Sequence, residues 1–202
     1  MTSIKNFLLN SHSKFKNYSF DTMLDTLLKQ SNVEKKSLRK PTLYVVAGPN
    51  GSGKSTLVTN FINYQIFGDK FVNAGIYAQT VYADIKGQKL REVKSMNHAT
   101  AEFERLVKEH KSFIFETVLS HESKLDLVKF AKKNGYKIVS IYVFTDTPEI
   151  NIERVKRRTE EGAVDVDEKK VYTRYSKSLQ NAFLLKEISD EFYQMNNTRN
   201  ID

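Results

Sequence analysis

The chain has 202 residues, of which 40% are hydrophobic, and it carries a formal net charge of +8. This length suits a single domain with a small appendage. The absence of cysteine excludes disulfides, thiolate zinc sites and cysteine nucleophiles, and the four histidines show no metal-ligand spacing. No apolar run reaches the roughly 18 residues that span a bilayer, and the N-terminus lacks a signal-peptide pattern. We therefore expect a cytoplasmic protein with no membrane partner.

Residues 1–40 are predicted to be a basic N-terminal extension. They hold eight Lys or Arg residues and three Asp or Glu residues, so they carry +5 of the net charge. A solvated basic flank explains this charge better than a nucleic-acid groove. Behind a capping Asp21, the stretch up to Gln30 has helical spacing, and its apolar face holds Met23, Leu24, Leu27 and Leu28. We expect a short amphipathic helix followed by a charged linker.

From Pro41 to the end of the chain, short apolar runs alternate with segments of helical spacing, which is typical of a parallel sheet covered by helices on both faces. The predicted strands are Leu43 to Ala47, Ser112 to Glu116 and Tyr136 to Phe144. Predicted helices follow the first strand over Ser55 to Tyr64, run up to His110, precede Asn134-Gly135, begin at Thr147-Pro148 and follow a polar loop from Glu160 to Asp167. The face of the long helix up to His110 holds Leu90, Val93, Met96, Ala99, Phe103, Leu106 and Val107. The prediction is an α/β three-layer sandwich with a mainly parallel central sheet.

The stretch Gly48-Pro49-Asn50-Gly51-Ser52-Gly53-Lys54-Ser55-Thr56 fits the phosphate-binding P-loop, also called Walker A. Its glycines allow positive φ and let backbone N–H groups approach phosphate oxygens at a helix N-terminus. Lys54 supplies a cation for the β- and γ-phosphates, and the Ser55 hydroxyl is a ligand for Mg²⁺. A plain glycine-rich turn is the alternative, but the preceding strand and following helix favour nucleotide binding.

Downstream residues narrow the class of P-loop protein. No Asp-Glu pair with a Ser-Gly-Gly signature suggests a transporter ATPase, and no Asn-Lys-x-Asp suggests a guanine-nucleotide switch. Arg154 and Arg158 are four residues apart, so they share one helix face and could neutralise a transferred phosphoryl group. This pattern is typical of a kinase. A solvated basic helix surface is the alternative.

From about Pro41 to Thr198 the chain resembles the zeta toxin and UDP-N-acetylglucosamine kinase family of P-loop kinases, with weaker similarity to chloramphenicol phosphotransferases. The similarity is carried by an ordered set of motifs: the P-loop, Phe115 to Ser120, Gly135-Tyr136, Thr147-Pro148-Glu149 with Arg154 and Arg158, Gly162 to Val166, Arg174 to Asn181, and Asn196-Asn197-Thr198. This resemblance makes residues 41–202 a P-loop kinase domain.

The resemblance implies transfer of the γ-phosphoryl group of ATP, with Mg²⁺, to the 3′-hydroxyl of a UDP-activated amino sugar, and an antitoxin as partner. Lys54, with Arg154 or Arg158, would hold the phosphates, and Glu116 and Thr117, with Ser120 and Asn73 beside them, would hold the sugar nucleotide. Independently of the family, polar residues at the carboxyl end of a central strand lie where α/β sheets bind ligands. The alternative for Glu116 is to support Mg²⁺ from outside its first coordination sphere.

Two departures from the family pattern concern the acceptor. The family reads Asn-Ala-Asp where this chain has Asn73-Ala74-Gly75, so the aspartate that would accept the hydroxyl proton is absent. The consequences left open are weak activity, use of Asp84 as a replacement base, or a different acceptor. The lid is also altered, because Gly162-Ala163-Val164 stands where the family has Gly-Gly-His.

Three functions are consistent with these motifs. The first is a zeta-type small-molecule kinase that acts on a sugar nucleotide. The second is an ATP-binding protein that has lost transfer chemistry, and the third is a nucleoside or polynucleotide kinase. For the extension, packing on the domain is favoured over covering the acceptor cleft or docking an antitoxin.

Overall fold

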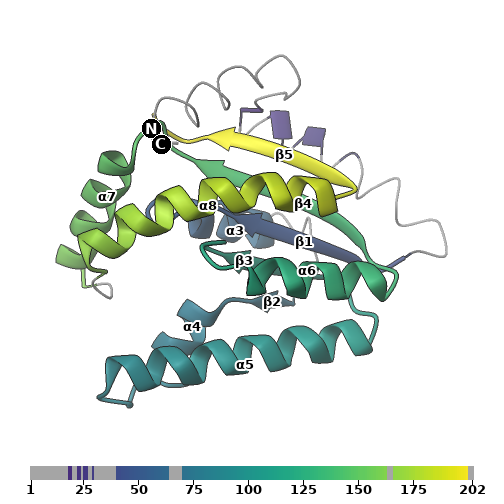
Figure 1. Ribbon diagram of the computed structural model, residues 1–202, viewed down its shortest axis with the longest axis horizontal. Helices are drawn as coiled ribbons and strands as arrows, with labels where there is room; N and C mark the ends of the chain where they lie inside the picture. Colours follow the sequence, from purple (N-terminus) through teal and green to yellow (C-terminus); the bar gives the residue numbers. More distant parts are fainter. Residues whose placement is uncertain are drawn as a thin grey trace.

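A parallel five-stranded sheet forms the centre of the molecule, in the order β2-β3-β1-β4-β5 (Figure 1). The computed structural model describes residues 18–19, 22–23, 25–26, 29, 40–63, 70–162 and 166–199. The strands are β1 (Thr42–Ala47), β2 (Phe71–Val72), β3 (Phe113–Thr117), β4 (Lys137–Phe144) and β5 (Glu191–Asn196). Because every pairing is parallel, all carboxyl ends lie at one edge of the sheet. The predicted α/β fold is confirmed.

Helices cover both faces of this sheet. They are α3 (Lys54–Asn63), α4 (Ala74–Gln79), α5 (Gln88–Lys108), α6 (Ser123–Lys133), α7 (Pro148–Glu160) and α8 (Glu168–Ile188). Figure 1 shows α5, α6 and α8 in front of the sheet and α3 behind it. A large apolar core lies under α5, α6 and α8, and a smaller one lies under α3. Strand β1 has β3 on one side and β4 on the other, which creates the crevice where open α/β sheets bind ligands.

The described part of the N-terminal segment packs on the face that α3 covers. Thr22, Met23, Asp25, Thr26 and Lys29 are helical, whereas Asp21, Leu24, Leu27 and Leu28 lie outside the described residues. Met23 is fully buried in the smaller core, together with side chains of β4 and β5. Before it, the Tyr18 N–H donates to the Gln194 carbonyl at 3.3 Å, and the Tyr18 ring meets that of Tyr193 edge-on.

The two halves of the long helix α5 differ in burial: the second half packs in the core, and the first half is largely exposed. Its second half buries Ala99, Phe103, Leu106 and Val107, as predicted. The prediction is wrong for Leu90, Val93 and Met96, whose side chains are about half exposed. The reason is geometric, since the first half of α5 lies beside α4 rather than over the strands, and the Tyr77 ring stacks on His98 there at 4.3 Å.

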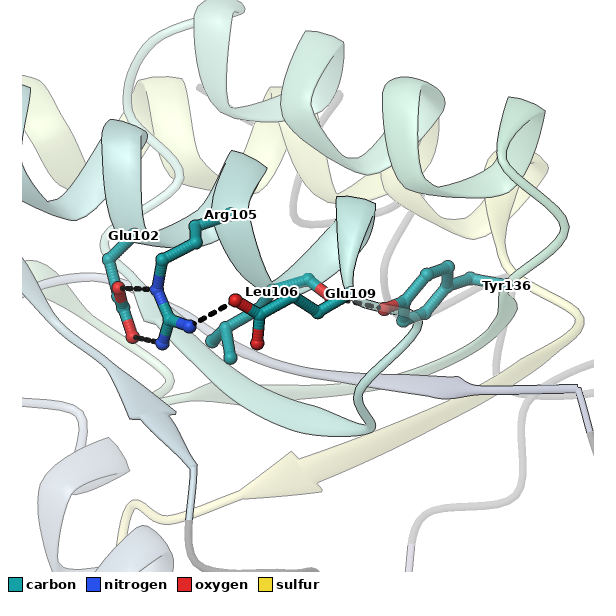
Figure 2. Close-up of polar contacts among 5 residues, drawn as sticks. All are labelled: Glu102, Arg105, Leu106, Glu109 and Tyr136. Carbon is teal, nitrogen blue, oxygen red and sulfur yellow. Dashed lines mark hydrogen bonds and ion pairs between the residues drawn. The ribbon is translucent and has the colours of Figure 1, made fainter.

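The end of α5 is tied to the start of β4 by Tyr136. Figure 2 shows its hydroxyl directed at the Leu106 carbonyl, to which it donates at 2.8 Å, and it lies equally close to the Lys111 carbonyl. On the outer side of the helix, Arg105 bonds both Glu102 and Glu109. This anchoring fixes how far the first half of α5 projects past the sheet.

Three elements had no counterpart among the predicted elements, namely the short strand β2, the short helix α4 and the edge strand β5. Asn73 starts α4, and its side-chain oxygen accepts from the N–H groups of Gly75 and Ile76. Thr147 is the N-cap of α7 as predicted, although its side chain makes no capping hydrogen bond. Among the described helices, none combines the length and apolar character needed to cross a membrane.

Candidate active site

A cleft of about 1420 Å³ opens at the carboxyl edge of the sheet. Its walls come from the P-loop, the start of α4, the first half of α5, the segment after β3, and the facing parts of α7 and α8. Ten lysines or arginines line it against three glutamates, so the described lining is strongly basic. A concave site of this sign attracts phosphorylated ligands.

The P-loop connects β1 to α3 at the floor of this cleft. Asn50, Gly51 and residues 53–56 line the cleft, while Gly48, Pro49 and the fully buried Ser52 lie beneath it. Gly48 has φ +149° and Gly53 has φ +95°. A Cβ at Gly48 would collide with the Val143 carbonyl, and one at Gly53 would collide with the Asn197 side chain. Only glycine therefore lets the loop take this path, which turns backbone N–H groups toward a phosphate.

Lys54 is 6% exposed at the start of α3, and its Nζ donates to the Pro49 carbonyl at 2.7 Å. Burial lowers its pKa from 10.5 to about 8, the negative charge of Glu116 partly opposes this shift, and Arg158 adds to it. A buried ammonium with one neutral acceptor among the described residues is poised to gain an anionic partner. This environment fits the triphosphate that the loop would bind.

Glu116 at the end of β3 joins two other predicted site residues. The Ser55 hydroxyl donates to Glu116 Oε1 at 2.9 Å, and the Asn73 side-chain amide donates to Oε2 at 2.8 Å. Both side-chain oxygens of Glu116 thus accept a hydrogen bond, which holds this side chain beside Ser55. A hydroxyl next to a carboxylate fits Mg²⁺ held between protein and nucleotide, because this cation prefers oxygen ligands and keeps several waters. Within the described residues no cluster of three or more His, Asp or Glu offers another metal site.

Helix α7 brings Arg154, Arg157 and Arg158 to the same cleft. Arg154 also contacts the C-terminal turn, because Nη1 donates to the Asn197 carbonyl at 2.8 Å and Nη2 to the Thr198 carbonyl at 3.3 Å. Asn197 in turn donates from Nδ2 to the Ser52 carbonyl at 2.9 Å. The arginine helix and the P-loop are thus linked through this turn. Partial burial and the neighbouring Arg157 lower the pKa of Arg154.

The segment after β3 forms the wall opposite the P-loop. Thr117, Ser120 and His121 line the cleft there. The Thr117 hydroxyl accepts from the Leu119 N–H at 3.1 Å, and the Asn181 side chain of α8 donates to the Leu119 carbonyl at 2.9 Å. The predicted acceptor residues Glu116, Thr117 and Ser120 line the same cleft as Asn73.

Asp84 does not join the other predicted residues. It is exposed in the loop between α4 and α5 and is not part of the cleft lining. Gly75 does line the cleft, and its backbone φ is not left-handed, so another residue type is sterically conceivable there. In the altered lid, Gly162 is described, and Ala163 and Val164 lie outside the described residues.

Sequence reasoning missed part of the site. The side chains of Arg91, Lys124, Arg157, Lys169, Lys170 and Lys177 line the cleft, although none was a predicted site residue. On α8 a helical-wheel signal was available, since Lys170, Arg174 and Lys177 follow spacings of four and three residues. From sequence alone, a basic helix face of this kind fits solvent exposure equally well, because the element that it faces is not known.

The parallel sheet and the loop at its switch point define a P-loop nucleotide-binding domain of the kinase-like class. Residues 43–178 match a family model described as an AAA domain, and the chain belongs to that family. A protein of Haemophilus influenzae described as uncharacterized is 32% identical over 130 residues, which make up 63% of this chain and 88% of that protein.

Solved structures share the fold at low sequence identity. A chain from the PezAT chromosomal toxin–antitoxin system of Streptococcus pneumoniae has a TM-score of 0.61 at 16% identity, covering 89% of this chain and 78% of its own. A chain of the AvrRxo1-ORF1:-ORF2 complex with ATP has a TM-score of 0.56 at 17% identity, over 83% and 57%. A chain of the Pnkp1/Rnl/Hen1 RNA repair complex has a TM-score of 0.57 at 20% identity, over 78% and 49%. These likenesses confirm the resemblance to zeta-type P-loop kinases at the level of the fold.

Proposed function

We propose that the protein is an ATP- and Mg²⁺-dependent small-molecule kinase of zeta-toxin type, with a sugar nucleotide such as UDP-N-acetylglucosamine as its acceptor. One observation carries this proposal: the P-loop lysine, the bonded set of Ser55, Glu116 and Asn73, and the α7 arginines all face one cleft. A protein that acts only as a nucleotide switch does not need a binding surface for an acceptor next to the γ-phosphate. This cleft has such a surface, with apolar side chains on α4 and α5 and polar side chains after β3.

In the proposed reaction an acceptor hydroxyl oxygen bonds to the γ-phosphorus while the bond to the bridging oxygen of ADP breaks, and the hydroxyl proton is released. Lys54 and the P-loop amides hold the β- and γ-phosphates, and Arg154 and Arg158 balance the charge on the transferred group. Ser55 and Glu116 would hold Mg²⁺ beside the phosphates, where the ion would neutralise further negative charge. Asn73 keeps Glu116 oriented while its own oxygen starts α4.

The direct test incubates the protein with ATP, Mg²⁺ and a panel of UDP-sugars and detects phosphorylated products by mass spectrometry. The expected result is a phosphorylated UDP-amino sugar that disappears in Lys54→Ala. ATP turnover or binding without any phosphorylated UDP-sugar would refute the acceptor assignment. An antitoxin partner belongs to the same proposal and would be tested by co-expression with neighbouring genes and measurement of growth.

A second candidate is an ATP-binding protein with little or no transfer activity, and Gly75 favours it. A Cβ built at Gly75 lies 3.0 Å from Asn73 Oδ1, so Gly75→Ala tests the steric effect and Gly75→Asp adds the carboxylate. If loss of the base has weakened a kinase, Gly75→Asp should raise turnover by about 10²-fold or more and Gly75→Ala should not. Equal turnover in both variants would show that the missing carboxylate does not limit the protein.

A further inference from the structure

The cleft holds more positive charge than its phosphate-donor end uses. Lys54, Arg154 and Arg158 serve the triphosphate in the proposed reaction, and Arg157 lines the same cleft from α7. Six other cations line the cleft farther away: Arg91, Lys124, Lys169, Lys170, Arg174 and Lys177. Cations gathered in a concave site raise the local concentration of anions, so this second group needs its own explanation.

Three of the six lie around the segment that follows β3. Arg174, Lys177 and Asn181 share one face of α8 because they are three and four residues apart. Asn181 contacts the Leu119 carbonyl, so this face looks onto the segment after β3. Lys124 stands in the first turn of α6, directly after that segment. The geometry therefore brings Lys124 from one side and Arg174 with Lys177 from the other.

The turn between them is held in an unusual conformation. Leu119 has φ +57°, a left-handed value that is unfavourable for a residue with a Cβ. The Thr117 hydroxyl and the Asn181 amide bond its N–H and its carbonyl, and the Leu119 side chain is fully buried. Because the turn is anchored at both its N–H and its carbonyl, the next residues, Ser120 and His121, line the cleft at defined positions.

Within the described parts of the chain, none of Lys124, Arg174 and Lys177 makes an ion pair or a side-chain hydrogen bond. Lys124 and Arg174 are half-buried, and burial lowers the pKa of Lys124. The three glutamates of the lining belong to other places: Glu92 to α5, Glu116 to the Ser55 network and Glu161 to the end of α7. Among the described residues the desolvated Lys124 therefore has no carboxylate partner, and a bound anion would offset that desolvation.

We propose that Lys124, Arg174 and Lys177, with Ser120 beside them, form a second anion site, which binds a phosphate group that the acceptor carries in addition to its reacting hydroxyl. This rests on the proposed function, and it restricts the acceptor to phosphate esters. A neutral sugar or another unphosphorylated alcohol would lack the group that this site recognises.

The binding test fills the donor site first. Protein saturated with a non-hydrolysable ATP analogue and Mg²⁺ is titrated with inorganic pyrophosphate by calorimetry at constant ionic strength. The wild type is expected to bind pyrophosphate, and Lys124→Gln and Lys177→Gln are each expected to weaken that binding by about tenfold, the loss of one charge-assisted hydrogen bond. Lys177→Arg should restore it, since a cation with donors is regained.

The matched control is Lys133→Gln, which removes one charge from the exposed last turn of α6, outside the cleft lining. It should change pyrophosphate affinity by about twofold at most, since exposed charges more than a Debye length away are screened. No pyrophosphate binding by the wild type, or equal losses in Lys124→Gln and Lys133→Gln, would overturn the proposal. Affinity for the ATP analogue, measured in each variant, separates this result from failure of the donor site.

Assays with different acceptors identify which kind of molecule carries the phosphate that this site binds. A sugar nucleotide predicts that Lys177→Gln raises KM for UDP-N-acetylglucosamine much more than it lowers kcat, while N-acetylglucosamine alone remains unphosphorylated. If no UDP-sugar is phosphorylated, the proposed function fails, and the pyrophosphate titration still decides the anion site. Competition of pyrophosphate by a short 5′-phosphorylated oligonucleotide, but not by UDP, would assign the site to nucleic-acid ends instead.

Discussion

The environment of Lys54 links its protonation to the binding of a phosphate group. Its ammonium group is buried, and this burial lowers its pKa to about 8, while the Pro49 carbonyl accepts a hydrogen bond from it. A bound triphosphate stabilises the charged form and raises this pKa again. Nucleotide binding therefore favours protonated Lys54, and affinity must fall when solution pH removes that proton before binding.

We predict that the affinity for ATP, measured without divalent cations, is nearly constant below pH 7.5 and then declines above the Lys54 pKa of about 8. The limiting decline is about tenfold per pH unit, the slope for one coupled proton. Calorimetric titrations from neutral to alkaline pH measure it. Lys54→Arg serves as the control, because a guanidinium stays charged throughout and its residual affinity should be flat. An equally steep decline in that variant would assign the titration to another group.

The contacts among site residues were less visible in the sequence than the residues themselves. The P-loop could be predicted because its glycine spacing is a local backbone requirement, and the structure shows the reason at Gly48 and Gly53. Glu116 was predicted as an acceptor ligand with a supporting role toward Mg²⁺ as the alternative, and its bond to Ser55 favours the second role. That contact joins residues 61 positions apart, so no local pattern reveals it.

At the level of the elements, a strand or helix could be predicted when its own segment contained the whole apolar pattern. Strand β4 is buried over nearly its whole length and reads as a continuous apolar run. Strand β5 mixes Glu191, Gln194 and Asn196 with apolar residues because it is an edge strand, so its sequence resembles a loop. Leu90, Val93 and Met96 fit the helical period of α5 but stand past the sheet, where their exposure depends on tertiary position alone.

Tyr136 is expected to stabilise the junction between α5 and β4. Its buried hydroxyl lies 2.8 Å from two carbonyls, those of Leu106 and Lys111, and burial raises its pKa to about 12 (Figure 2). We predict that Tyr136→Phe lowers the free energy of unfolding by about 1–2 kcal/mol, because buried carbonyls lose their donor.

Urea denaturation at neutral pH measures this change. Tyr82→Phe is the matched control, since the Tyr82 hydroxyl makes a longer contact of 3.3 Å to His98 in a half-buried site. Its cost should stay below about 0.5 kcal/mol. If both variants unfold at the same urea concentration, the Tyr136 hydroxyl is not an anchor of α5.

At the scale of the whole molecule, two residues before β1, Tyr18 and Met23, pack in the folded core. Residues 1–40 were predicted as an extension with a helix that packs on the domain, and the positions of Tyr18 and Met23 agree with packing. Both contact the face shared with α3, and neither lines the cleft. Tyr18 and Met23 therefore do not cover the cleft. Strand β5 gains a neighbour on one face from them, which suits an edge strand that α8 covers on the other.

This packing makes a stability prediction for a residue far from the cleft. Met23 is fully buried against side chains of β4 and β5, so Met23→Ala leaves a cavity and should lower the free energy of unfolding by about 2–5 kcal/mol. Lys29→Ala, at an exposed position of the same helical segment, should cost less than about 0.5 kcal/mol. Denaturant unfolding of both variants measures the difference, and ATP-analogue affinity should be the same in both because neither residue lines the cleft. Equal stability of the two variants would mean that the segment is not part of the core, whereas a loss of nucleotide affinity in Met23→Ala alone would mean that β5 transmits its packing to Asn197 and the P-loop.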